Sequence, residues 1–228
     1  MPITIPTAED LAPLTPEELA AVPIFPLPRM VFFPGTALPL HLFEARYREM
    51  IRDCITVGPA AMAVALLEPG WEEDYEGEPP IARVSGVGRI VWHEEMPDGR
   101  YNIVLVGTGR ALLAPLPMDG RSYRRGAATL LAEVGCARDA VTGTLLGCAS
   151  ALTTLLRATD PDFQLHLPPE ASPGRIADIV ADRLIPDVAR RQEILETLDV
   201  AKRIDLVTDA VSGALADLAP ARSGGSTH

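Results

Sequence analysis

Residues 23–48 read PIFPLPRMVFFPGTALPLHLFEARYR and contain five prolines. Proline fixes its own φ angle and lacks the amide hydrogen that a helix interior or a central strand uses. Residues 24–39 can therefore form short extended segments but no helix. Pro34 and Gly35, side by side in the middle of this stretch, are typical of a sharp turn.

The end of the stretch changes to the three- and four-residue spacing of an amphipathic helix, which we expect at about 44–57. Its predicted apolar face consists of Phe43, Tyr47, Met50, Ile51, Cys54 and Ile55. Glu44 falls in the first turn, where a carboxylate complements the positive end of the helix. A shorter helix is expected at about 16–21, because Thr15-Pro16-Glu17-Glu18 forms a capping box with proline at the first helical position.

The next part of the chain is strand-like, with short apolar runs at 62–67, 81–84, 89–94, 101–106, 110–114 and 127–134. Pro97-Asp98-Gly99 predicts a hairpin turn, and Gly107-Thr108-Gly109 predicts another tight link. Five or six short strands at this spacing favour a small barrel or a curled sheet over βαβ units.

After Gly135 the pattern is helical, and we expect helices at about 138–159, 173–184, 188–198 and 200–218, with start signals at Ser172-Pro173, Asp187 and Asp199. The small and polar residues 219–228 predict a disordered tail. The chain therefore divides into a β-rich part at 1–134, a helical part at 135–218 and the tail. This order of elements predicts an α+β fold.

Net charge and lysine content exclude several functions. The 228 residues carry a formal net charge of −11, and Lys202 is the single lysine. An acidic chain whose one dense basic run is Arg121, Arg124 and Arg125 is a poor nucleic-acid binder. A P-loop is also absent, since Lys202 follows no glycine-rich loop, and no Gly-x-Ser-x-Gly nucleophile turn occurs. We therefore expect no enzymatic activity.

Metal and cofactor sites have no support in the sequence either. The four histidines are dispersed, and the acidic run between residues 72 and 78 lacks the ligand spacing of a calcium loop. Gly86-x-Gly88 and Gly107-x-Gly109 lack the third glycine of a dinucleotide fingerprint, so we interpret them as hairpin or bulge glycines. No cofactor is expected.

Cysteine usage and the first residues predict a cytoplasmic protein. Cys54, Cys136 and Cys148 are odd in number and lack metal-site spacing, which favours small buried thiols in a reduced compartment. Residues 1–28 contain no basic residue, unlike a secretory signal. Residues 140–156 carry no charge, but their threonines and glycines favour a buried central helix over a membrane span.

Two groups of residues are candidates for binding. Trp71 and Tyr75 lie in the acidic loop, where paired aromatics either fold back onto the core or anchor a partner. His41, Phe43, Glu44 and Arg46 close the opening stretch. Three of these, His41, Glu44 and Arg46, could form a polar ligand pocket, although the same groups can also simply hold the fold.

The opening stretch resembles the signature of the Lon protease N-terminal domain family, from Pro23-Ile24-Phe25-Pro26-Leu27 through Phe33-Pro34-Gly35 to Leu38-Pro39-Leu40-His41-Leu42-Phe43-Glu44-x-Arg46-Tyr47-Arg48. The resemblance continues in Asp98-Gly99-Arg100-Tyr101 leading to Gly107 and Arg110, and in Arg191-Gln192-x-Ile194-Leu195-Glu196-x-x-Asp199-x-x-x-Arg203. It covers about residues 20–218. The ATPase and peptidase parts of the full protease have no counterpart in this sequence.

The resemblance implies a PUA-like β pseudo-barrel followed by a helical subdomain, and a role in recognising protein substrates. We therefore expect a free-standing, non-enzymatic module that binds unfolded or partner polypeptides, on an apolar groove of the β-rich part or at its junction with the helices. The alternative is a small-molecule-binding regulatory domain. The sequence does not determine the oligomeric state.

Overall fold

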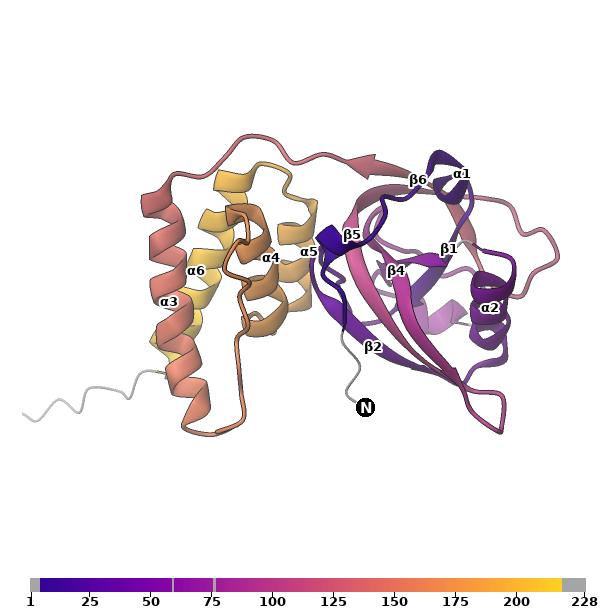
Figure 1. Ribbon diagram of the computed structural model, residues 1–228, viewed down its shortest axis with the longest axis horizontal. Helices are drawn as coiled ribbons and strands as arrows, with labels where there is room; N and C mark the ends of the chain where they lie inside the picture. The colour runs from indigo at the N-terminus through magenta and orange to yellow at the C-terminus, as the bar shows by residue number, and fades with distance from the viewer. Residues whose placement is uncertain (1–4, 59, 76, 219–228) are drawn as a thin grey trace, which may run out of the picture.

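The computed structural model describes residues 5–58, 60–75 and 77–218. A β-rich part and a helical part lie side by side (Figure 1). The strands are β1 (Val22–Leu27), β2 (Ala37–Leu42), β3 (Ala61–Leu66), β4 (Val84–Glu95), β5 (Tyr101–Pro115) and β6 (Arg125–Leu131). The helices are η1 (Ala8–Asp10), α1 (Pro16–Leu19), α2 (Ala45–Thr56), η2 (Trp71–Asp74), α3 (Asp139–Arg157), α4 (Pro173–Leu184), α5 (Val188–Glu196) and α6 (Val200–Leu218).

The sheet closes on itself. Its strand order is β2-β5-β4-β3-β1-β6, and β6 pairs with β5 as well as with β1. Five strands therefore form a closed barrel, while β2 is added along the first half of β5. Among the described strand pairs, β1–β3 is parallel and the others are antiparallel, and an isolated parallel bridge joins Val134 to Asp199. The barrel followed by helices confirms the predicted α+β fold.

The prediction of a tight link at Gly107-Thr108-Gly109 is wrong. These residues lie in the middle of β5, a strand of 15 residues, where the pairing with β4 shifts register and leaves Thr108 as the extra residue of a bulge. The two expected strands on either side of them are one continuous strand. The bulge interpretation of these glycines is confirmed, and the turn at Pro97-Asp98-Gly99 is present, with Gly99 at a φ of 77°.

A close backbone approach explains why glycine is needed here. A Cβ atom on Gly107 would lie 2.2 Å from the carbonyl oxygen of Phe33, and one on Gly86 would lie 2.0 Å from that of Phe32. The proline-rich segment between β1 and β2 therefore lies directly against the sheet. Phe32 packs into the barrel core beside α2, whereas Val31 and Phe33 pack into the core of the helical part. This segment joins the two parts of the molecule.

The predicted helix at 44–57 is present as α2, and Tyr47, Met50, Ile51 and Cys54 are buried as expected. Phe43 is an error of the prediction, because its side chain is 61% exposed. It precedes the helix, and the backbone has turned it out of the apolar face. The strand expected at 81–84 is also not formed. Ile81 makes only an isolated bridge to Leu67, and β4 begins at Val84.

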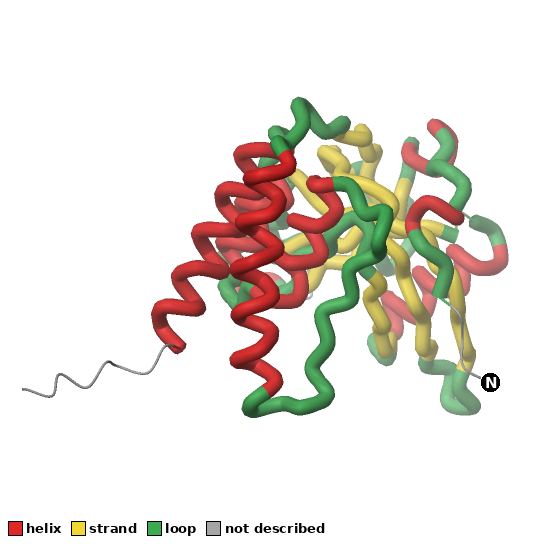
Figure 2. Tube along the Cα trace, turned by 60° about the vertical axis from the view of Figure 1, so that its left-hand side comes forward, coloured by secondary structure: helices red, strands yellow, loops and turns green. Residues whose placement is uncertain are grey.

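Helix α3 is not the fully buried central helix that the sequence predicts. It lies at the outer edge of the helical part (Figures 1 and 2) and buries one face against α4 and α6. Leu146 and Leu155 are exposed on it. By length and hydropathy alone, α3 is the single helix of the described residues that qualifies as a candidate membrane span, with 28% of that window buried. Part of the apolar surface of α3 therefore stays exposed to solvent.

A buried ionic cluster joins the barrel to the helices. Arg110 of β5 and Arg203 of α6 both contact the carboxylate of Asp178 on α4, and both also contact Glu133. Arg203 is fully buried, Arg110 is 3% exposed and Asp178 is 1% exposed. Arg110 further donates to the carbonyl oxygen of Leu195 at 2.9 Å. Charges from three separate elements therefore neutralise each other at the junction.

The starts of the helices follow the capping residues in the sequence. The side chain of Asp187 accepts a hydrogen bond from the Arg190 amide at 2.9 Å, at the start of α5. We expect Asp187→Ala to lower the free energy of unfolding by about 1 kcal/mol, because this amide loses its partner. Urea denaturation would measure the change. Asp187→Ser retains a capping oxygen, so it should recover most of the loss, and equal losses in the two variants would contradict the capping role.

The tail expected at residues 219–228 lies outside the described residues, and the division of the chain at residues 134 and 135 stays a prediction.

Candidate functional site

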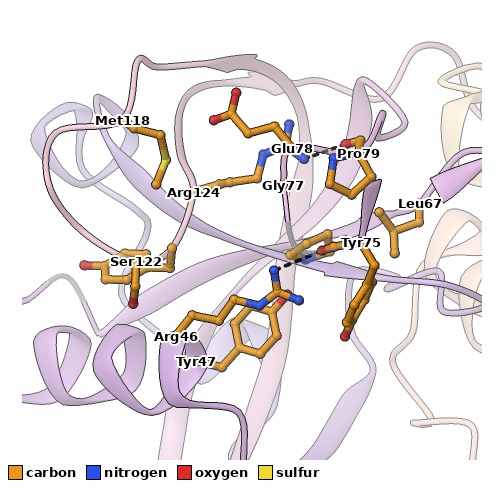
Figure 3. A pocket seen from close by; sticks show the side chains of 12 residues that line it. Arg46, Tyr47, Leu67, Tyr75, Gly77, Glu78, Pro79, Met118, Ser122 and Arg124 are labelled. Carbon is orange, nitrogen blue, oxygen red and sulfur yellow. Dashed lines mark hydrogen bonds between the residues drawn. The ribbon is translucent and has the colours of Figure 1, made fainter. Parts of the chain in front are cut away.

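A cavity of about 160 Å³ opens on the barrel beside α2 (Figure 3). Its walls come from α2, from the loop after β3 and from the loop between β5 and β6. The lining residues are Pro26, Arg46, Tyr47, Leu67, Tyr75, Gly77, Glu78, Pro79, Met118, Ser122, Tyr123 and Arg124. We call this site the Arg46 cavity.

The guanidinium group of Arg46 lies between two aromatic rings at the cavity wall. Its central carbon is 4.7 Å from the ring centroid of Tyr47 and 4.7 Å from that of Tyr75. A cation stacked on aromatic faces is held by the ring quadrupoles. Burial alone would lower the pKa of Arg46, but nearby Tyr47 and Glu44 raise it, so the group stays charged.

Glu44 fixes the loop over this arginine. Its carboxylate accepts a hydrogen bond from the Tyr75 hydroxyl at 2.7 Å and another from Arg46 Nε at 3.0 Å. Arg46 also donates to the carbonyl oxygen of Tyr75 at 3.1 Å (Figure 3). Trp71 packs against Tyr75 edge to face, with ring centroids 5.4 Å apart. Glu44, Arg46, Trp71 and Tyr75, four of the six candidate residues, thus form one contact group.

The other two candidates lie elsewhere. His41 is on β2, where its Nδ1 is 2.7 Å from Oδ1 of Asn102, and its ring stacks at 6.3 Å on the exposed Phe43. Neither residue lines the Arg46 cavity. The described contacts therefore do not bring His41 together with Glu44 and Arg46, because His41 lies on β2 whereas Glu44 and Arg46 lie at the start of α2.

Arg124 and Tyr47 bring hydrogen-bond donors to the cavity. Arg124 donates one hydrogen bond, to the carbonyl oxygen of Pro79 at 2.7 Å, and no carboxylate of the described residues pairs with it. Tyr47 is 4% exposed, and its hydroxyl has no hydrogen-bond partner within the described chain. Burial raises the pKa of Tyr47, and the charges of Arg46 and Arg124 act in the opposite direction. The hydroxyl is therefore a protonated donor between two cations.

Two neighbouring arginines, one in the loop and one at the start of β6, have different partners. Arg121 and Arg125 both pair with Asp119, and Arg121 also lies 3.4 Å from Asp53. The basic run that the sequence shows is thus split, with only Arg124 reaching the cavity. Burial lowers the pKa of Arg124, and the nearby Glu78 opposes this effect.

Sequence reasoning did not assign Tyr47, Met118 or Arg124 to a site. Tyr47 was expected only as a core residue, and Arg124 only as part of a surface run. The one usable signal was the pair of aromatics at residues 71 and 75, since aromatics in an otherwise acidic loop indicate that the loop packs onto something.

Metal binding and thiol chemistry have no geometric support in the described part of the chain. No group of three or more His, Cys, Asp or Glu side chains is placed there to hold a metal ion. Of the three cysteines, Cys54 is buried, Cys148 is half-buried and Cys136 is exposed, so the expectation of three buried thiols holds only for Cys54. The Arg46 cavity combines hydrogen-bond donors with apolar walls.

Comparison with known proteins agrees with this fold. Residues 21–213 match the family described as the ATP-dependent protease La (LON) substrate-binding domain. The chain belongs to this family. The family resemblance seen in the opening stretch is thereby confirmed, and the match includes the Lon substrate-binding domain but neither an ATPase nor a peptidase domain.

Relatives within the Lon family are distant and much longer. The Lon protease of Paraburkholderia phytofirmans is 29% identical over 194 residues, which cover 83% of this chain and 24% of that protein. The Lon protease of Escherichia coli is 24% identical over 190 residues, covering 82% of this chain and 24% of that protein. The chain spans about a quarter of the length of the curated relatives it matches.

Two solved structures share the fold. A Lon N-terminal domain protein from Xanthomonas campestris has a TM-score of 0.58 at 22% identity, covering 83% of this chain and 98% of the other. The N-terminal domain of the Mycobacterium avium complex Lon protease has a TM-score of 0.61 at 18% identity, covering 84% and 98%.

Proposed function

We propose that this protein is a non-enzymatic module that recognises polypeptides, with the Arg46 cavity as part of its binding surface. The observation that supports the proposal is a concave, mostly apolar site with hydrogen-bond donors. The site lies in a member of a family that is described as a substrate-binding domain. Sites of this kind combine apolar walls with a few placed polar groups. Tyr75 supplies aromatic contact area in the cavity lining, while Trp71 packs against it, and both rings also pack on the barrel core.

The exposed pair His41 and Phe43 extends the proposal as a second contact. Phe43 is a large exposed aromatic on the β-rich part, and such residues are enriched at interfaces. We place the protein in the cytoplasm, with polypeptides as partners and no role for nucleic acid, membrane or cofactor.

We expect unfolded polypeptides to bind with micromolar affinity, equivalent to about −8 kcal/mol, and with little dependence on salt. Acidic peptides should bind worst, because a net charge of −11 repels them at long range. Fluorescence anisotropy with a labelled apolar peptide, an acidic peptide and a folded control protein, at two salt concentrations, would measure this. Equal binding of all three, or none at hundred-micromolar protein, would contradict the proposal.

The second candidate is a small-molecule-binding regulatory domain, and the small volume of the Arg46 cavity favours it. A metabolite that binds only the folded state raises the melting temperature in a saturable way. Such stabilisation by a small ligand, without any binding of unfolded polypeptide, would favour this candidate.

A further inference from the structure

The Arg46 cavity presents hydrogen-bond donors that the protein leaves unused. The Tyr47 hydroxyl is buried without a partner within the described residues, and Arg124 uses one of its guanidinium nitrogens, Nη1, on Pro79. A buried polar group without a partner costs about 1–3 kcal/mol, so such a group in a cavity indicates that a ligand completes it. The Tyr47 hydroxyl can donate or accept, whereas the Arg124 guanidinium group only donates, so a ligand atom that meets both groups must be an acceptor.

The other lining residues and the volume of the cavity indicate the kind of ligand group to which this acceptor atom belongs. Pro26, Leu67, Pro79 and Met118 give the cavity an apolar lining. Its volume of about 160 Å³ resembles the roughly 150 Å³ of a cavity that holds benzene, and lies below the roughly 300–1,000 Å³ of sites for drug-sized ligands. One apolar side chain with its attached polar group fits these dimensions, whereas a long segment of chain does not.

The charge of the site selects among acceptors. Arg46 is already paired with Glu44 at 2.9 Å, so Arg124 is the cation without a carboxylate partner in the described residues. The carboxylate of Glu78 also lines the cavity and would repel a dianion. A singly charged carboxylate therefore suits the site better than a phosphate group. Arginine and tyrosine donors to a carboxylate form charge-assisted hydrogen bonds, which are stronger than neutral ones.

We propose that the Arg46 cavity binds the carboxy-terminal residue of a polypeptide, with its terminal carboxylate on Tyr47 and Arg124 and its apolar side chain against Leu67, Pro79 and Met118. This inference rests on the proposed function, because it names the part of the polypeptide that the module recognises. It predicts that the module distinguishes chain ends from internal segments.

The test compares two labelled short peptides of one sequence, rich in glycine and serine and ending in leucine. One peptide has a free terminal carboxylate and the other a terminal carboxamide. We expect anisotropy titrations to show at least tenfold tighter binding of the free acid. N-acetyl-leucine and inorganic phosphate serve as competitors, and we expect the former to compete weakly and the latter not at all.

Two variants assign the preference to the named donors. Tyr47→Phe removes only the unpartnered hydroxyl, so it should not lower the melting temperature, while it reduces the preference for the free acid several-fold. Arg124→Gln should abolish most of the preference. Arg121→Gln is the matched control, since Arg121 has the same charge and lies on the same loop but pairs with Asp119 and Asp53 outside the cavity. It should bind both peptides as the parent protein does.

The outcomes separate this inference from the proposed function. Equal micromolar binding of acid and amide would overturn the carboxy-terminal site and leave polypeptide recognition intact. No binding of either peptide or of any unfolded polypeptide would overturn both. If N-acetyl-leucine competes as tightly as the peptide, the ligand of the cavity is a small carboxylate and not a polypeptide. If Tyr47→Phe and Arg124→Gln keep the full preference for the free acid, the carboxylate binds at another place.

Discussion

Asp178→Ala is expected to lower the free energy of unfolding by about 3–5 kcal/mol, the usual cost of removing one partner from a buried ion pair. The substitution leaves Arg110 and Arg203 buried with Glu133 as their shared carboxylate. Burial raises the pKa of Asp178 to about 6 while both guanidinium groups oppose this, so the carboxylate is ionised at neutral pH. Urea denaturation at neutral pH would measure the loss.

Two further variants control for this result. Asp178→Asn keeps a hydrogen-bond acceptor at the same place but removes the charge. We expect its free energy of unfolding to lie between that of the parent protein and that of the alanine variant. Asp209→Ala removes an exposed carboxylate from α6 and should change stability by no more than about 0.5 kcal/mol. Similar stabilities of Asp178→Ala and Asp209→Ala would show that the cluster contributes little to joining the two parts.

The sequence predicts the α+β order of the elements well, since it depends on local signals. Capping residues at Thr15, Ser172 and Asp187 mark helix starts that the structure places within a residue or two of the predicted ones. The wrong division of the long strand β5 has one cause. The prediction treats glycines as ends of strands. Gly107 instead lies inside a long bulged strand, where the missing side chain lets the backbone of Phe33 approach the sheet.

The ionic cluster was missed because it is built from elements far apart in the chain. A signal existed in the helical pattern, where Arg203 occupies an apolar position between Val200 and Val207. A charged residue on the buried stripe of a helix requires a partner of opposite charge. The identity of that partner, on α4, depends on packing that no local pattern encodes.

The same reasoning applies to the Arg46 cavity. Arg46 and Tyr75 were both singled out in the sequence, but 29 residues separate them, and only the fold shows that the ring covers the guanidinium group. Arg124 is a further 49 residues along the chain and joins them through the loop before β6. Local patterns therefore predicted which residue types were unusual, while chain topology decided which of them meet.

Tyr47→Ala is expected to lower the free energy of unfolding by about 3–5 kcal/mol, the range for replacing a buried large aromatic by alanine. The Tyr47 ring packs edge to face on Phe25 with centroids 4.5 Å apart, and it also supports the guanidinium group of Arg46. Its loss would leave a cavity between α2 and the barrel. Thermal and urea denaturation would both report the change.

Two matched variants on the same segment show whether the ring or the hydroxyl matters. Tyr47→Phe retains the ring and removes a buried hydroxyl that has no partner in the described chain, so it should not lower the free energy of unfolding and should raise it by up to about 1–3 kcal/mol. Phe43→Ala should change stability by no more than about 0.5 kcal/mol, because that ring is 61% exposed, although the helical spacing of the sequence assigns it to the same apolar face. A large loss in Phe43→Ala, or a small one in Tyr47→Ala, would mean that α2 packs on the barrel by a different face.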